Sequence, residues 1–235
     1  MKLPLIFTLF FTLTFVQLAK AQFETVHRMD DQTRFLDKET GKPLTYKDFQ
    51  RLNREFPNQY LPIAVYDKYG NTDYYLVRKK LKVELETGQV DMFGELEKPI
   101  VGKPVQPFVM QGADGKTYDS EQLRGSYVML SFWLKFKKPF FGPGNTKDLV
   151  ALLSSVKAKG IPVVSLGVSY SSAEECRAAM EEFDLGFVPI PDSRGFTIRY
   201  ASLNTPSFLL IDPDGKVLAT SEIDSPLKLE KYFKK

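Results

Sequence analysis

The sequence predicts an α/β protein in which a central sheet is flanked by helices and preceded by a small α+β module. Two patterns lead to this expectation. From Val101 onward, strand-like apolar segments alternate with segments of helical periodicity. Within that part, Ile161–Val168 is a continuous apolar run, which is typical of a parallel strand with both faces buried. After an N-terminal leader we therefore expect two parts, residues 22–100 and residues 101–235.

Residues 1–21 have the pattern of a secretory signal peptide. Lys2 gives a positive start, Leu3–Leu18 is apolar, and Ala19 and Ala21 supply the small residues that a signal peptidase needs. The alternative is an uncleaved anchor, although the apolar run is shorter than the about 20 residues that span a bilayer. We therefore expect an exported protein, periplasmic or extracellular, with no stable membrane span after the signal is cleaved.

The charge balance gives no electrostatic case for nucleic acid. The formal net charge is +3, and two of the basic residues, Lys2 and Lys20, belong to the predicted signal peptide. The mature chain would be nearly neutral, so it lacks the basic surface that attracts nucleic acid or an anionic membrane. His27 is the only histidine and has no cluster of ligand residues around it. We therefore expect no metal site, no cofactor and no histidine-based triad.

The first part, residues 22–100, contains one predicted helix and one predicted hairpin. Thr45–Phe56 begins with a capping-box pattern, Thr45 with Asp48, and continues with an apolar stripe. Leu61–Tyr66 and Tyr74–Lys80 are strand-like and flank a Gly-Asn turn. We interpret residues 81–100 as a connector between the two parts.

The second part, residues 101–235, is predicted to alternate strands with helices. The expected strands are Val105–Met110, Tyr127–Trp133, Ile161–Val168, Ser207–Ile211 and Lys216–Thr220. The expected helices are Asn145–Lys159, a second that starts at Ser171 or Ser172 and runs to Phe183, and Pro226–Phe233. The first of these helices carries its apolar residues on one face and ends at Gly160, as a helix that packs on a sheet should.

Short motifs follow one another along this second part. They are Gly102–Phe108, Asp114–Lys116, Leu123–Val128, Phe132–Trp133, Thr205–Asp212 and Gly215–Lys216. In this order they resemble the thioredoxin-like superfamily, in its redoxin and envelope thiol–disulfide oxidoreductase branch. The resemblance implies a thioredoxin-like central sheet over about residues 101–235 and leaves residues 22–100 unexplained.

The resemblance also identifies what is missing. In that family a C-x-x-C motif follows the Phe-Trp strand end, and the matching positions here are Lys137, Lys138, Pro139 and Phe140. Thiol–disulfide exchange needs a thiolate, and the only cysteine of the chain is Cys176. The sequence therefore excludes dithiol exchange within the chain and peroxidase chemistry at the usual position. It predicts a degenerate active site, and we do not expect an enzyme; if it is one, it would be a thioredoxin-like oxidoreductase or peroxidase.

The segment after Trp133 is predicted to be a loop. Pro139 and the run Gly142–Gly144 should delay the next helix to Asn145 or Thr146, leaving a basic and aromatic segment in place of a redox turn. Two interpretations of this segment stay open. It forms a surface for an acidic or aromatic partner, or its phenylalanines fold back onto the core.

Cys176 also allows two interpretations. Ala173, Cys176, Met180 and Phe183 fall at helical spacing, which places the sulfur on an apolar face where cysteine acts as a small inert hydrophobe. The alternative is a reactive thiol that provides residual thiol-redox or antioxidant, redoxin-like activity with a partner's thiol.

Thr205-Pro206 matches a proline that has a cis peptide bond in the resembled family and lies beside the redox motif. The resemblance implies that Thr205 pairs through its backbone with an extended peptide; alternatively, the turn is kept for the fold alone. We expect a non-catalytic binding or assembly role in the cell envelope, with a protein or extended peptide as partner. The predicted binding residues are Phe136, Lys137, Lys138, Pro139, Phe140, Thr205 and Pro206.

Overall fold

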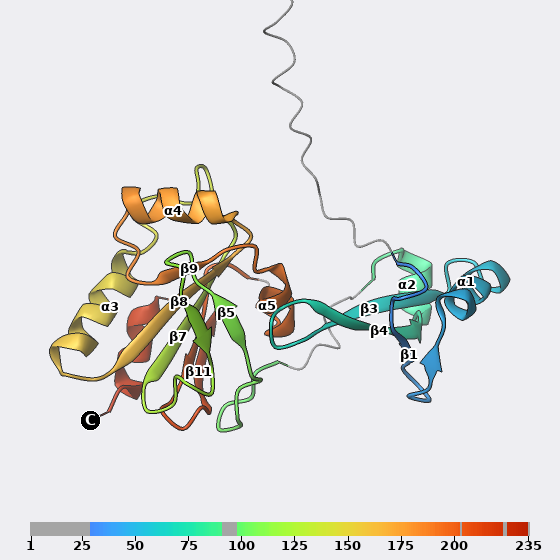
Figure 1. Cartoon of the computed structure of the whole chain (residues 1–235), viewed down its shortest axis with the longest axis horizontal. Coiled ribbons are helices and arrows are strands. Elements are labelled where there is room, and N and C mark those ends of the chain that lie inside the picture. The colour runs from blue at the N-terminus through green and yellow to red at the C-terminus, as the bar shows by residue number, and fades with distance from the viewer. Residues whose placement is uncertain (1–28, 91–97, 203, 223–224, 235) are drawn as a thin grey trace, which may run out of the picture.

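The computed structural model describes residues 29–90, 98–202, 204–222 and 225–234. The predicted signal peptide, residues 1–21, lies outside these ranges, as does His27. None of the helices in the described ranges has the length and apolar character needed to cross a membrane. The two larger of its three sheets organise the described chain into an N-terminal lobe, residues 29–90, and a C-terminal lobe, residues 98–234 (Figure 1).

The N-terminal lobe is a four-stranded sheet in the order β2-β1-β4-β3 with two helices. Its elements are β1 (Phe35–Asp37), β2 (Pro43–Leu44), α1 (Tyr46–Glu55), β3 (Tyr60–Tyr66), β4 (Thr72–Lys79) and α2 (Lys82–Thr87). The predicted capping box is confirmed, since Thr45 Oγ1 accepts the Asp48 N–H at 3.1 Å and Asp48 Oδ2 accepts the Thr45 N–H at 3.1 Å. The predicted hairpin is confirmed as β3 and β4.

Part of the segment interpreted as a connector is helical, which corrects that prediction. Helix α2 follows β4 directly, and its Glu84 is buried. The Glu84 carboxylate accepts two hydrogen bonds from the Arg78 guanidinium, each at 2.6 Å, and one from the Leu81 N–H at 2.7 Å. This bidentate pair ties α2 to the sheet, although the helix has no apolar periodicity that would reveal it.

The C-terminal lobe has a five-stranded sheet in the order β11-β10-β7-β8-β9 and a separate hairpin, β5–β6. The strands are β5 (Val109–Gln111), β6 (Thr117–Asp119), β7 (Tyr127–Trp133), β8 (Val163–Ser169), β9 (Val188–Ile190), β10 (Ser207–Ile211) and β11 (Val217–Glu222). The helices are α3 (Lys147–Ala158), α4 (Ala173–Glu182), α5 (Arg194–Arg199) and the 3-10 helix η1 (Pro226–Tyr232). Strands β7, β8 and β9 are parallel, whereas β10 runs antiparallel to both of its neighbours, β7 and β11. The predicted sheet flanked by helices is thus confirmed; β9 and α5 were not predicted, and the expected strand Val105–Met110 is shorter and starts later.

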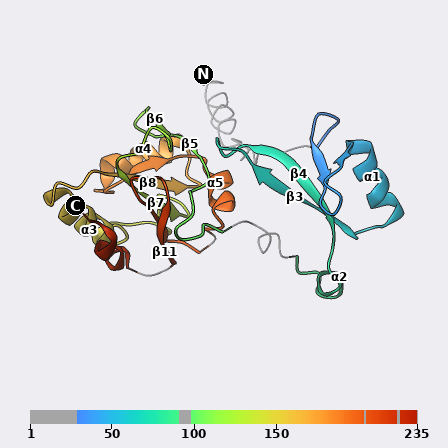
Figure 2. The same cartoon turned by 90° about the horizontal axis from the view of Figure 1, so that it is seen from below.

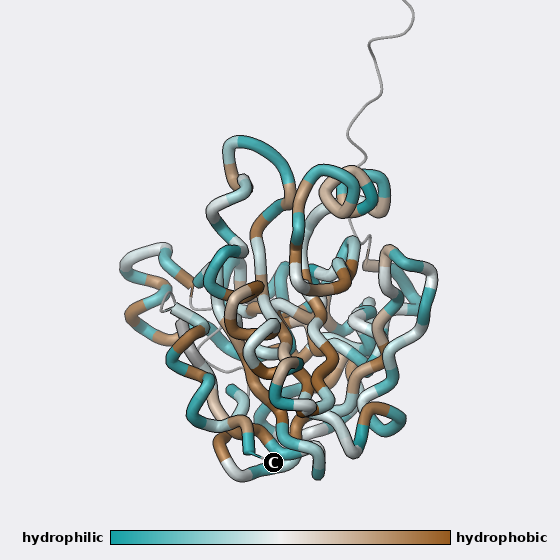
Figure 3. The backbone as a smooth tube through the Cα atoms, turned by 90° about the vertical axis from the view of Figure 1, so that its left-hand side faces the viewer, coloured by the Kyte–Doolittle hydropathy of each residue, from teal (hydrophilic) through white to brown (hydrophobic). Residues whose placement is uncertain are grey.

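Apolar side chains fill both faces of this sheet. On one face α3, α4 and η1 pack over a cluster that includes Trp133, Leu152 and Cys176. On the other face α5 contributes Phe196 to a second cluster with Phe132. Viewed from the side of the C-terminal lobe, the most hydrophobic chain segments run through the middle and hydrophilic segments surround them (Figure 3). The buried strands β7 and β10 therefore form a rigid base for the loops at their ends.

The two lobes meet where the tip of the β3–β4 hairpin contacts α5 (Figure 2). Gly70 at the tip has a φ of 78°, and a Cβ atom there would come within 2.9 Å of the Phe196 ring. A Cβ atom on Gly195 would clash with the Gly70 carbonyl. The Val109 N–H donates to Lys68 O at 2.7 Å, and the Arg199 guanidinium donates to Tyr66 O. Two glycines and a guanidinium thus allow the hairpin to lie directly against the helix.

Candidate functional site

Trp133 ends β7 and forms the base of the candidate site. All seven residues of this strand are buried. The indole N–H donates to Ser131 Oγ at 2.8 Å, and the ring stacks on Phe187 with centroids 5.6 Å apart and meets Phe208 edge-on. The hydrogen bond and the surrounding rings fix the orientation of the indole.

The loop that follows, residues 134–146, is fixed to the start of α4. The Tyr170 N–H donates to Leu134 O at 3.1 Å, and the Phe136 N–H donates to Ser171 Oγ at 2.7 Å. Helix α3 begins only at Lys147, with Thr146 at the N-cap position. The predicted late start of this helix is therefore confirmed, and the positions that match the redox motif lie in a loop and not in a helical turn.

The two interpretations of the aromatic loop each describe part of it. Phe136 and Phe141 are buried, and their rings contact one another at 5.2 Å. Phe140, in contrast, is 53% exposed. The prediction that Phe136 is a contact residue is corrected, because its ring packs on Trp133 and Phe187 inside the lobe. The buried pair of rings holds the exposed segment Lys137–Phe140 at the surface.

That exposed segment is a compact turn. Lys137 O accepts the Phe140 N–H at 2.9 Å and the Phe141 N–H at 3.1 Å. The Lys138-Pro139 peptide bond is cis, and Lys138 and Pro139 are exposed. The turn therefore presents cationic and apolar side chains on an ordered backbone.

A groove separates this loop from the turn that precedes β10. Its volume is about 260 Å³. The lining residues are Trp133, Leu134, Lys135, Phe140, Asn145, Thr205 and Pro206. The Thr205-Pro206 peptide bond is cis, as the family resemblance implied. The structure thus brings Phe140, Thr205 and Pro206 together, while Lys137, Lys138 and Pro139 lie on the adjoining turn.

Four lining residues, Trp133, Leu134, Lys135 and Asn145, were not among the predicted binding residues. Leu134, Lys135 and Asn145 line the groove because both ends of the loop return to it. Leu134 and Lys135 directly follow Trp133, and this position next to the strand end was the sign in the sequence that they could line the site. Asn145 is placed by its own hydrogen bonds, since its Oδ1 accepts the Gly142 N–H at 2.8 Å.

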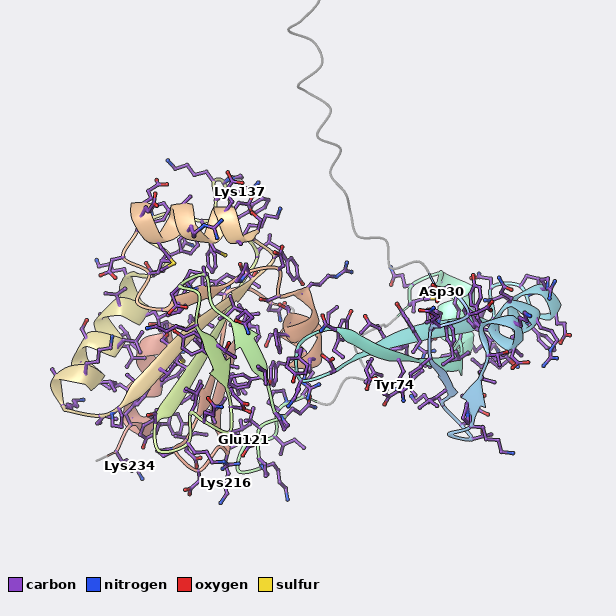
Figure 4. All side chains as sticks on the ribbon, in the orientation of Figure 1. Asp30, Tyr74, Glu121, Lys137, Lys216 and Lys234 are labelled. Carbon is purple, nitrogen blue, oxygen red and sulfur yellow. The ribbon has the colours of Figure 1, made fainter. Side chains whose placement is uncertain are left out.

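The loop carries three lysines, Lys135, Lys137 and Lys138. Lys137 forms an ion pair with Glu175 in the first turn of α4. Burial raises the pKa of the Glu175 carboxyl, but hydrogen bonds from Lys137 and from the Ser172 N–H outweigh burial and hold this pKa below its usual value. Figure 4 shows Lys137 at the α4 end of the lobe, with Lys216 and Lys234 at the opposite end.

Cys176 lies inside α4 and is fully buried. Its Sγ is 3.9 Å from Ser171 O, and burial raises the pKa of the thiol to about 11. The predicted position on the apolar face of the helix is confirmed. Within the described ranges, no group of three or more His, Cys, Asp or Glu side chains could hold a metal ion.

Comparisons with known proteins give one family model and several relatives that resemble this chain. Residues 101–220 match the sequence model described as the AhpC/TSA family. Two curated relatives, from Bacillus cereus and Bacillus thuringiensis subsp. konkukian, are both called thiol-disulfide oxidoreductase ResA. Each is 30% identical over 149 residues, which span 61% of this chain and 82% of the relative. A solved thiol-disulfide oxidoreductase from Bacteroides fragilis is 26% identical, with a TM-score of 0.46, over 55% of this chain and 98% of that one.

Proposed function

The chain belongs to the AhpC/TSA family, within the thioredoxin-like superfamily, and from this membership we propose that it is an exported binding protein without dithiol chemistry. Its groove would hold an extended segment of another polypeptide in a binding or assembly role in the cell envelope. The family membership confirms the resemblance inferred from the motifs between Gly102 and Lys216. The relatives named as thiol-disulfide oxidoreductases support a thioredoxin-like redox or assembly role, of which binding without chemistry is the more specific form.

This proposal rests on the described residues that line the groove, which offer apolar side chains to a peptide and include no thiol. Leu134 and Phe140 are 39% and 53% exposed, so the groove has apolar walls at the surface. Thr205 and Pro206 form the opposite side. Among the described residues, none hydrogen-bonds to the Thr205 backbone. An extended peptide can pair with such a free backbone and place alternate side chains in the groove.

Residual thiol chemistry at Cys176 receives less support. Only a thiolate attacks a disulfide or a peroxide. The Cys176 side chain is fully buried and has a pKa of about 11, so very little of it is ionised at neutral pH. Neither Lys137 nor Phe140, which occupy the positions that match the redox motif, can replace the thiolate.

Binding is tested by recovery of partners from an envelope fraction. The unaltered chain is compared with a double variant, Phe140→Ala with Lys137→Ala, and with a matched control, Phe56→Ala with Lys47→Ala. The control removes an exposed phenylalanine and an exposed lysine from the N-terminal lobe. We expect the control to recover the same partners as the unaltered chain and the groove variant to lose them. Identical recovery by all three proteins would show that this groove is not the contact site.

Chemistry is tested separately. We expect no reduction of insulin disulfides, no consumption of peroxide, and no labelling of Cys176 by a thiol reagent in the native chain. Labelling should become complete when the chain is unfolded in urea. Turnover of a disulfide at an enzymatic rate, abolished by Cys176→Ala, would establish the redox function and refute the non-catalytic one.

A further inference from the structure

Lys135 gives the groove a charge preference. Among the described residues that line the groove, it is the one charged residue, and none of them is a carboxylate. Its side chain is half-buried, so solvent screens its charge less than that of a fully exposed lysine. Lys138 is exposed on the adjoining turn. Any charged group that enters the groove therefore meets a positive potential first.

In the part of the chain that the structure describes, two of the three lysines on this loop lack an ion-pair partner. Glu175 in the first turn of α4 is paired with Lys137. Lys135 is close enough to Glu175 to help lower the pKa of that carboxyl. Among the described residues, neither Lys135 nor Lys138 forms an ion pair. Of the three lysines on this loop, Lys137 is paired, and the other two keep their positive charges without an ion-pair partner in the described ranges.

The groove has room for a side chain that carries the opposite charge. Its volume of about 260 Å³ equals that of roughly eight or nine waters at about 30 Å³ each. The free backbone of Thr205 lies on one side and Lys135 on the other. A peptide that pairs with Thr205 would therefore direct one of its side chains toward Lys135, because side chains alternate along an extended strand.

We propose that the groove selects an extended polypeptide segment that carries an aspartate or glutamate, whose carboxylate pairs with Lys135. This inference rests on the proposed function, since it specifies the segment that the groove binds. Lys138 adds attraction for further acidic residues on the same side. A basic segment is disfavoured because its charge would have the same sign as the lysines.

Binding of a peptide to the groove can be measured with a fluorescent residue of the chain itself. Trp133 is the only tryptophan in the sequence, and it lines the groove. Binding of a peptide can therefore be followed by the fluorescence of this one residue in the purified chain. The probes are three capped nine-residue peptides of alternating valine and serine, identical except for a central Glu, Gln or Lys.

We expect the Glu peptide to bind about three- to five-fold more tightly than the Gln peptide, which is the range for a partly exposed ion pair. The Lys peptide should bind most weakly. Raising the salt concentration to about 1 M, where the Debye length is about 3 Å, should remove most of these differences. In the Lys135→Gln variant the Glu and Gln peptides should bind equally, whereas Lys135→Arg should keep the preference.

The control is Lys216→Gln, which removes an exposed lysine at the opposite end of the lobe (Figure 4). It should leave the Glu preference intact. Equal binding of the Glu and Gln peptides to the unaltered chain would overturn the charge selection and leave the peptide groove standing. A Glu preference that survives Lys135→Gln would overturn the role of Lys135. If no peptide changes the Trp133 fluorescence and none competes for recovered partners, the proposed function itself fails.

Discussion

The two lobes are held together by different forces. In the C-terminal lobe, two large clusters of buried apolar side chains cover both faces of the sheet. In the N-terminal lobe, the buried apolar cluster of the described residues consists of Phe35, Phe49 and Val77, with partly buried neighbours. A buried ion pair between Arg78 and Glu84 adds to this small cluster. The difference indicates that the C-terminal lobe is stabilised by its own core, whereas the N-terminal lobe depends on polar pairing and on contact with its neighbour.

The largest expected effect is that of separating the lobes. We expect residues 101–235 alone to unfold cooperatively in urea, because apolar burial is sufficient there. Residues 22–100 alone should show little cooperative unfolding, since so small a core rarely stabilises a domain. Circular dichroism of the two fragments in urea would measure both. A cooperative transition in the isolated N-terminal fragment would show that the lobe does not depend on docking.

Breaking the buried ion pair should have the next largest effect. Arg78→Ala leaves the Glu84 carboxylate buried without its partner, which typically destabilises a protein by about 3–5 kcal/mol. Hydrogen exchange should rise in β4 and α2 and stay unchanged in the C-terminal lobe. The matched control is Lys82→Ala, which breaks an exposed Lys82–Glu86 pair and should change stability by less than about 0.5 kcal/mol. Similar effects of the two substitutions would mean that the buried pair is not what holds α2.

Gly195→Ala tests the contact between the lobes. It should lower the stability of the full chain but not the stability of the isolated C-terminal fragment. In the full chain, the new methyl group clashes with the Gly70 carbonyl, and we expect a loss of about 1–3 kcal/mol, the usual effect of overpacking. The isolated fragment of residues 101–235 lacks Gly70 and Tyr66, which hold the atoms nearest to the new methyl group. Replacing a helical glycine there should be neutral or stabilise by up to about 1 kcal/mol. Urea unfolding of both proteins gives the comparison. The same sign in both would contradict direct packing of the hairpin on α5.

The smallest expected effect is that of the partly exposed ion pair between Lys137 and Glu175. The pKa of Glu175 in the folded chain is below its usual 4.5. The pair therefore stabilises the fold above about pH 4.5, and this contribution is lost as the pH falls through the lower, folded pKa. Its size should be under about 1 kcal/mol because the Lys137 side chain is half-exposed.

Titration of the Glu175 carboxyl by NMR would measure this effect directly. In Lys137→Ala the pKa should rise, since burial then acts with less opposition. Lys138→Ala is the matched control and should leave the titration unchanged, because Lys138 does not contribute to the shift. An unaltered Glu175 titration in Lys137→Ala would show that the pair does not form in solution.

Local signals allowed much of the fold to be predicted. Helix α1 is specified by its own capping box, and the hairpin by its Gly-Asn turn. Strand β1 was missed because its three residues become a strand by pairing with β2 and, in parallel, with β4, which is far along the chain. Helix α2 was missed for a similar reason, since its anchor is a carboxylate that needs a guanidinium from another element.

The residues of the groove were predicted only in part, because some of them are placed by contacts between distant segments of the chain. The family resemblance indicated that Phe140 and Thr205-Pro206 would lie together, and they line one groove. Phe136 and Phe140 are chemically identical, and no local pattern decides which of them is buried. That choice depends on Trp133 and Phe187, which surround Phe136 in the folded lobe. The position of Lys135 in the groove likewise depends on how the loop returns to the sheet.

The hydrogen bond from the Arg199 guanidinium to strand β3 also affects association between molecules. Strand β3 is the outer strand of its sheet, and such an edge offers free carbonyl and N–H groups to another chain. Pro62 removes one of the donors on this strand. Arg199 occupies the carbonyl of Tyr66 near its end. Contact between the lobes therefore also covers part of an edge strand that could pair with another chain. Variants in which the lobes separate should self-associate through β3 before they unfold.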